Sequence, residues 1–125
     1  MSLKFSPGKN IAIKVPNHEF EQTVAFYADI LGLTRLSLQD VDAVDSVAFE
    51  FGDKNLWIDA VDNLSQAEVW LEIATNSIEE AANYLEQKGV SRRDKIEPLP
   101  SGLKGFWISS PTNIIHLIHE EPVSR

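Results

Sequence analysis

The sequence predicts an α+β fold in which one strand–helix unit occurs twice. An alternating apolar strand leads into an amphipathic helix at residues 10–32, and the same order returns at residues 68–89. Each helix carries a tyrosine and ends at a glycine, so that Tyr27 and Gly32 match Tyr84 and Gly89 at the same separation. We therefore expect two similar half-domains with a site near the surface where they meet.

In the first half, residues 10–15 alternate between apolar and other side chains, as in a strand with one packed face. Asn17 or a near neighbour is expected to cap the helix that follows, and Gly32 provides its left-handed stop. After a polar stretch with Asp40, Asp42 and Asp45, two further alternating segments at 46–51 and 56–61 surround a Gly52 turn and predict a hairpin.

In the second half, residues 68–74 predict a strand, and Ser77 with Glu80 has the spacing of a helix capping box. Residues 91–102 are charged and carry prolines, which predicts a loop with a short strand near Ile96. Residues 106–109 and 113–118 predict a last hairpin. The expected order is therefore βαββ with one more short strand, followed by βαβββ.

Composition limits the classes of partner. A chain of 125 residues is expected to be a single domain, and its net charge of −8 disfavours nucleic acids and anionic membranes, which would repel it. The absence of cysteine excludes disulfides and thiolate metal sites. We also find neither a long apolar run nor the apolar core of a signal peptide, so the expected location is cytoplasmic.

Several of these segments resemble the vicinal oxygen chelate superfamily, which includes glyoxalase I, bleomycin-resistance proteins and extradiol dioxygenases. The resemblance rests on residues 10–15, on the Phe-Tyr and Leu-Gly-Leu within residues 24–33, on residues 68–73 and 81–89, and on the Ser-Pro-Thr-Asn at 110–113. It implies two paired βαβββ modules, at roughly 8–62 and 66–120, whose curved mixed sheets form a cup with the helices outside. It also implies a homodimer.

Metal-using members of that superfamily hold a divalent ion through an inward His on the first strand of each module and an inward Glu on the last. By this resemblance, the first-strand positions are Asn10 and Glu68, and the last-strand positions are Asp59 and His116, with Trp57 as the alternative to Asp59. The usual ligands are therefore replaced. Asp59, Glu68 and His116 remain as a candidate set for one divalent metal ion, and Glu68 and His116 are also the candidate catalytic residues.

A second group of residues fits ligand binding without a metal. Trp70 and Glu72 follow Glu68 on one strand face, and Lys14 follows Asn10 in the equivalent place. Together with Asn10 and Trp57 they would hold a flat or charged small molecule by stacking and ion pairing. The alternative is that these side chains only fill the cup.

Other polar residues carry less information. Arg92, Arg93 and Lys95 could recognise an anionic group, but Asp94 among them favours a solvated loop. His119 alternates away from His116 and is expected to have no special role.

Three functional hypotheses follow. The first is an enzyme for a small oxygen-rich or conjugated molecule, of lyase, isomerase or dioxygenase type, with an altered metal site. The second is a metal-free protein that binds or sequesters a small molecule, in which Lys14, Trp57 and Trp70 matter most. The third is a non-catalytic interaction protein whose cup is filled.

Overall fold

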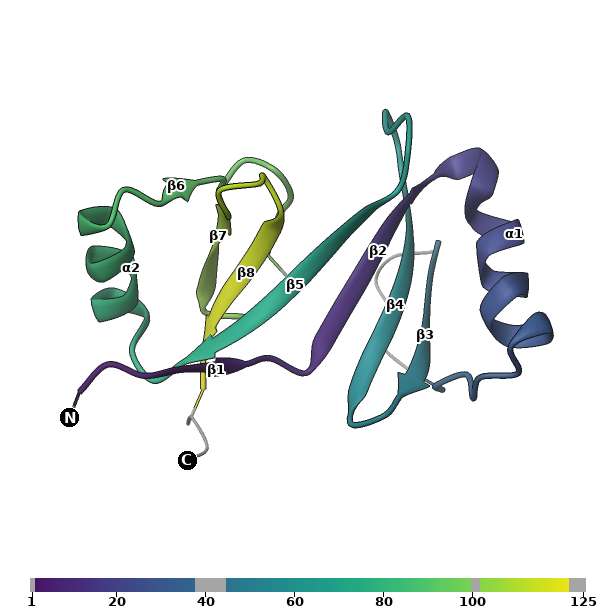
Figure 1. Cartoon of the computed structure of the whole chain (residues 1–125), viewed down its shortest axis with the longest axis horizontal. Coiled ribbons are helices and arrows are strands. Elements are labelled where there is room, and N and C mark those ends of the chain that lie inside the picture. The colour runs from purple at the N-terminus through teal and green to yellow at the C-terminus, as the bar shows by residue number, and fades with distance from the viewer. Residues whose placement is uncertain (1, 38–44, 100–101, 122–125) are drawn as a thin grey trace. The chain divides into compact units, whose positions relative to one another are not determined.

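A computed structural model describes residues 2–37, 45–99 and 102–121 of the chain (Figure 1). The chain divides into two compact units. One unit is Lys9–Trp70, and the other combines Met1–Gly8 with Leu71–Arg125. Each unit carries strands together with helical segments. Asp40 and Asp42 of the predicted polar stretch lie outside the described part of the chain.

The Lys9–Trp70 unit is built on a parallel strand pair. Strand β2 (Asn10–Pro16) runs parallel to β4 (Lys54–Val61), and β3 (Ser46–Phe51) is antiparallel to β4. The first residues of β5 (Glu68–Thr75) pair antiparallel with β2. Arg35 forms an isolated antiparallel bridge to Phe49 of β3.

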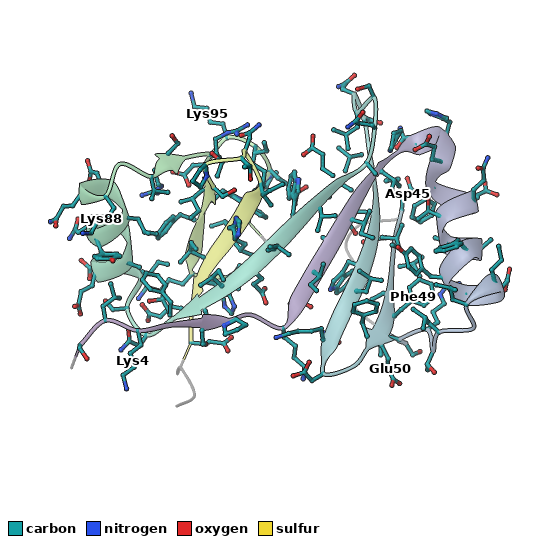
Figure 2. The ribbon with its side chains drawn as sticks, viewed as in Figure 1. Lys4, Asp45, Phe49, Glu50, Lys88 and Lys95 are labelled. Atoms are coloured by element: carbon teal, nitrogen blue, oxygen red, sulfur yellow. The ribbon has the colours of Figure 1, made fainter. Side chains whose placement is uncertain are left out.

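A single helical stretch connects β2 to the rest of this unit. It begins as a 3-10 turn, η1 (Asn17–Glu19), continues as α1 (Phe20–Ala25) and closes as a π-helix, η2 (Phe26–Ile30). Phe20, Val24 and Tyr27 pack against a buried cluster of sheet residues, formed by Val15, Val47, Phe49, Leu56 and Ile58. Phe49 is fully buried, and Figure 2 shows it labelled on β3 beside α1. One sheet face is therefore the core of this unit.

The second unit repeats this plan with a longer helix. Strand β1 (Phe5–Pro7) pairs antiparallel with β5, and β5 runs parallel to β8 (Ile115–Glu120). Strand β7 (Gly105–Ser109) is antiparallel to β8. The short strand β6 (Ser91–Arg92) lies at the edge beside β7. Helix α2 (Ile78–Gln87) packs through Ala81 against Phe106, Ile108 and Ile118. Alternate residues of these strands thus face α2.

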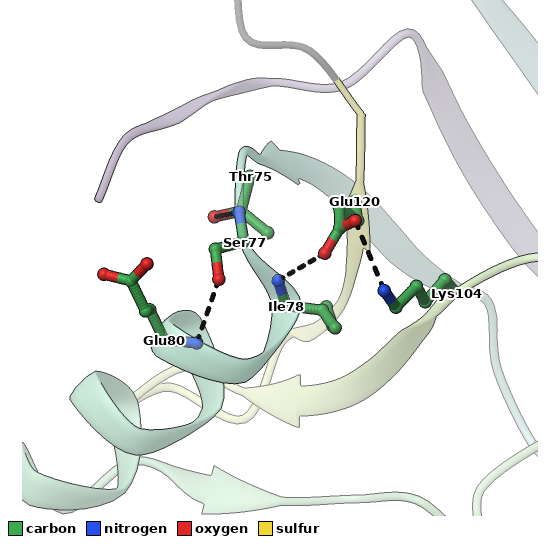
Figure 3. Close-up of polar contacts among 6 residues, drawn as sticks. All are labelled: Thr75, Ser77, Ile78, Glu80, Lys104 and Glu120. Carbon is green, nitrogen blue, oxygen red and sulfur yellow. Dashed lines mark hydrogen bonds and ion pairs between the residues drawn. The ribbon is translucent and has the colours of Figure 1, made fainter. Parts of the chain in front are cut away.

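The start of α2 is fixed by hydrogen bonds that satisfy its first backbone N–H groups (Figure 3). Ser77 Oγ accepts from the N–H of Glu80 at 3.3 Å, which confirms the predicted cap. Glu120 Oε1 on β8 accepts from the N–H of Ile78 at 2.8 Å, and the other oxygen meets Lys104 Nζ at 3.4 Å. The Ile78 N–H lowers the pKa of Glu120 below its ordinary value; partial desolvation opposes this, and Lys104 adds to it.

Most local predictions are confirmed. The strands at 10–15, 46–51, 56–61 and 68–74 are present, and both helices are followed by glycines with positive φ, +70° at Gly32 and +80° at Gly89. The α+β class is confirmed. The N-terminal strand β1 was not predicted, because its three residues contain no alternation to detect.

Three local predictions are wrong. Asn17 does not cap the first helical stretch; its amide donates to Asp62 Oδ1 at 2.6 Å instead. The short strand lies at Ser91–Arg92 and not near Ile96, because only the first residues of that loop pair with β7. The last strand begins at Ile115 rather than at residue 113, since Asn113 is part of a tight turn with φ of 65°.

Among the described residues, no helix has the length and apolar character needed to cross a membrane.

Replacement of Glu120 by Gln should lower the melting temperature at neutral pH and remove a pH dependence. Because the pKa of Glu120 is lowered on folding, its stabilisation is complete above the unfolded-state value and is lost as the pH falls through the folded-state value. The difference between wild type and Glu120→Gln should therefore shrink between pH 7 and pH 3 in thermal unfolding. Glu79→Gln, an exposed charge in the same helical turn, is the control. A pH-independent difference would contradict this assignment.

Candidate functional site

One sheet face of the Lys9–Trp70 unit gathers most of the predicted site residues. Strand register places Ala12 beside both Trp57 and Trp70, and Lys14 beside both Asp59 and Glu68. Because Ile13, Val15 and Ile58 face α1, these alternate residues lie on the other face, which we call the α1-distal face. Asn10 lies two residues before Ala12 and shares it.

Lys14 is the centre of the α1-distal face. Its ammonium lies 2.9 Å from Asp59 Oδ2 and 4.4 Å from the centre of the Trp70 ring. Only 5% of Lys14 is exposed, so its charge is largely removed from water. A buried ammonium is stable only with a partner, and Asp59 with the Trp70 ring supplies one. The lysine, the carboxylate and the indole therefore form one electrostatic cluster.

Neighbouring side chains complete the hydrogen bonding of Asp59 and Trp70. The hydroxyl of Ser46 donates to Asp59 Oδ1, so both Asp59 oxygens are engaged. The indole N–H of Trp70 donates to Glu68 Oε1 at 3.0 Å. Glu68 itself is exposed, which leaves its carboxylate available to a molecule arriving from solvent.

Asn10 forms a second polar group on the same face. Its carbonyl oxygen Oδ1 accepts from the Trp57 indole at 2.9 Å and from the Asn55 amide at 3.1 Å. An amide oxygen has two lone pairs, and both have donors here. Asn10 is therefore a positioning residue for Trp57, whose ring is half-buried on this face.

These residues do not fit a divalent metal ion. At two of the expected ligand positions in this unit the oxygens are already occupied by protein donors, because Lys14 and Ser46 engage both oxygens of Asp59 and Trp57 with Asn55 engages Asn10 Oδ1. Glu68 keeps one oxygen open, which is too few ligands for a metal. A metal would have to displace these bonds and would meet the Lys14 ammonium. Across the described part of the chain, no group of three or more His, Asp or Glu residues is arranged to hold a metal.

His116 lies on the face of its own unit that is covered by α2. Register places it beside Leu71 and Ile108, and Ile108 packs in the α2 core. Its Nδ1 lies 3.0 Å from the Ile114 carbonyl oxygen. The expectation that His116 points to the side away from the helices is therefore wrong, because the short turn before β8 shifts the strand by one residue. This orientation does not favour the catalytic and ligand roles predicted for His116.

His119 takes the orientation that was expected of His116, and the sequence reasoning missed it. It lies on the face opposite α2, the α2-distal face, and is 7% exposed. Its buried Nε2, without a hydrogen-bond partner, is 3.6 Å from Glu72 Oε1 and 3.4 Å from Glu121 Oε2. Glu72, predicted to bind substrate, thus lies beside an imidazole. The sequence could have indicated His119, because it and His116 fall on opposite faces of the same apolar strand.

Two glycines permit the close packing around this pair. A Cβ on Gly8 would lie 2.5 Å from Glu72 Cγ, and one on Gly105 would lie 2.3 Å from the Ile118 carbonyl oxygen, next to His119. Only glycine can occupy such positions without displacing its neighbours. The Glu72–His119 pair is therefore held by backbone that approaches it closely.

Comparison with solved structures identifies the fold. A Mn(II)-bound glyoxalase from Novosphingobium aromaticivorans superposes with a TM-score of 0.68 at 15% identity over 99% of this chain, which spans only 44% of that protein. The chain has the vicinal oxygen chelate fold. Methylmalonyl-CoA epimerase from Mycobacterium tuberculosis gives 0.64 at 11% identity over 94% of this chain and 89% of that one.

A third similar structure carries the superfamily name. A glyoxalase/bleomycin resistance protein/dioxygenase superfamily member from Vibrio splendidus gives a TM-score of 0.60 at 11% identity, over 96% of this chain and 100% of that one. No protein-family model matches the chain, and no curated protein matches its sequence. At these identities the likeness establishes the fold, while activity has to be argued from this chain's own residues.

Removal of the Lys14 charge should destabilise the protein through Asp59. Lys14→Met leaves the Asp59 carboxylate, 18% exposed, without its cation. We expect a loss of about 2–3 kcal/mol in the free energy of unfolding, measured with urea, somewhat less than for a fully buried pair. Lys14→Met/Asp59→Asn should recover at least about 1 kcal/mol of that loss. Lys4→Met, at an exposed lysine, should change stability by less than about 0.5 kcal/mol. Additive effects of the two substitutions would contradict the coupling.

Proposed function

We propose that this protein binds a small organic molecule on the α1-distal face without a metal ion. The observation that carries the proposal is the 2.9 Å ion pair of Lys14 and Asp59, since a protein ammonium neutralises the carboxylate that would otherwise call for a metal. The fold supports this proposal, because a glyoxalase, an epimerase and a dioxygenase-superfamily member have the same fold.

The surface chemistry narrows the class of ligand. The half-buried Trp57 offers ring surface, and the exposed Glu68 carboxylate offers acceptors, while the Trp70 ring is buried against Lys14. A planar molecule with hydrogen-bond donors fits both features, because the ring stacks and the donors reach a carboxylate. Lys14 is committed to Asp59 and acts as a positioning residue for the Trp70 ring.

Binding should therefore survive removal of metal ions. Catechol, a planar ring with two adjacent hydroxyl donors, is a suitable probe, and we expect it to quench tryptophan fluorescence equally with and without EDTA. Glu68→Gln should weaken this binding by about tenfold, because it replaces a charged acceptor by a neutral one. Trp107→Phe, in the other unit, is the control for general loss of fluorescence. Binding that requires added Mn²⁺, or no quenching by millimolar catechol, would refute the proposal.

A second candidate function is metal-independent proton transfer by Glu72 and His119. The observation that favours it is the buried His119 Nε2, 3.6 Å from a Glu72 oxygen and lacking a hydrogen bond. An imidazole beside a carboxylate is a common general base, and such groups typically contribute about 10²- to 10⁴-fold to a rate. In this version, Nδ1 of His119 would take a proton from the carbon next to a carbonyl group. Glu72 and Glu121, which lie beside Nε2, would stabilise the imidazolium.

This candidate predicts isotope exchange in a carbonyl substrate. Methylmalonyl-CoA, the substrate in the name of one similar structure, is the probe. In D₂O, the wild-type protein should exchange the proton at the carbon between its two carbonyl groups, as followed by NMR. His119→Gln should slow this by about 100-fold or more. His18→Gln, at an exposed histidine, should exchange at the wild-type rate. Exchange no faster than in buffer would leave ligand binding as the function.

Homodimerisation and a cytoplasmic location complete the proposal. The first rests on the superfamily resemblance, and light scattering measures it directly. The second is tested by cell fractionation.

A further inference from the structure

A cavity beside the loop after β6 carries a concentration of positive charge. Its volume is about 560 Å³, and it is lined by Arg92, Arg93, Asp94, Lys95 and Ile96. Three cationic side chains and one carboxylate give this short segment a net charge of about +2, whereas the whole chain carries −8. All of these residues belong to one unit, Met1–Gly8 with Leu71–Arg125.

The Arg92 guanidinium is held in place on two sides. Its Nε donates to Asp94 Oδ2 at 2.9 Å, and its Nη2 forms an ion pair with the same oxygen at 2.7 Å. Its central carbon lies 4.3 Å from the centre of the Phe106 ring. Asp94 is fixed in turn, because its Oδ1 accepts from the backbone N–H of Trp107 at 3.2 Å. The planar group is therefore preorganised, while one amino group of its fork is not used by Asp94.

Arg93 is positioned without being neutralised. Its backbone N–H donates to the Trp107 carbonyl oxygen at 2.8 Å, and its Nη1 donates to Asn113 Oδ1 at 2.8 Å. Asn113 is a neutral acceptor, so this bond sets the direction of the guanidinium and leaves its charge available. Lys95 is exposed, and Figure 2 shows it labelled at the outer edge of this loop.

We propose that this cavity binds the phosphate or carboxylate group of a small anionic molecule. Two prepositioned guanidinium groups match such oxyanions, since each offers parallel N–H donors. The cavity volume falls within the range of small-molecule sites. A polyanion such as a nucleic acid is disfavoured by the net charge of the rest of the chain. This site is independent of the α1-distal face and does not rest on its function.

The proposal is tested with inorganic phosphate and with malonate, each titrated into the full chain and followed by backbone amide NMR. We expect saturable binding that perturbs residues 92–96 and 113 and weakens as sodium chloride is raised. Arg93→Gln should weaken the binding by about tenfold or more. Asn113→Gly, which removes the acceptor of the guanidinium but keeps the left-handed turn, should weaken it by about two- to fivefold. Arg35→Gln, an exposed arginine in the other unit, is the matched control and should bind as wild type.

The two probes separate the possible sources of the oxyanion. Tighter binding of phosphate indicates a phosphorylated ligand, and tighter binding of malonate indicates a carboxylic acid. The proposal is overturned if Arg93→Gln binds both probes as wild type does, or if perturbations spread over all surface lysines and arginines equally. It is also overturned if neither probe binds at low salt while amide spectra show a folded protein.

Discussion

The ion pair between Lys14 and Asp59 is the constraint on which the chemistry of the α1-distal face depends. A carboxylate with little exposure must have a cation or donors, and here the cation is an ammonium on the neighbouring parallel strand. The position of this ammonium also determines how the residues around it pack. Trp70 packs over the same ammonium, and its indole in turn orients Glu68. The side chains of this face therefore hold one another in place through contacts among themselves.

Much of the fold could be predicted because its signals are local. Helix ends depend on single residues, and Ser77, Gly32 and Gly89 each carry the expected conformation or hydrogen bond. Strand faces follow from alternation, which has a fixed period of two. Alternation alone was therefore enough to place Asn10 and Lys14 together on one side of β2, although it did not reveal which residues would pair with them.

The orientation of the last strand could not be predicted in this way. Residues 114–119 read Ile, Ile, His, Leu, Ile, His, so apolar residues stand at both parities and either histidine could face away from α2. The turn decides the matter. Ser110 Oγ accepts from the N–H of Ile114, and Asn113 takes a left-handed conformation, which together set where β8 begins. Such contacts between side chain and backbone leave no periodic signal, and His119 was overlooked for that reason.

The separation of the two sheet faces explains how the fold can persist while the site changes. Phe49 and Ile58 in one unit, and Phe106 and Ile118 in the other, pack against helices and form the cores. Asp59, Glu68 and His119 alternate with such residues and point the other way, so their identities are not fixed by core packing. A likeness of 15% identity with a Mn(II)-bound glyoxalase is therefore compatible with a face organised around an ammonium. The backbone supplies equivalent positions, and the side chains placed there decide which cation, if any, the protein has to bind.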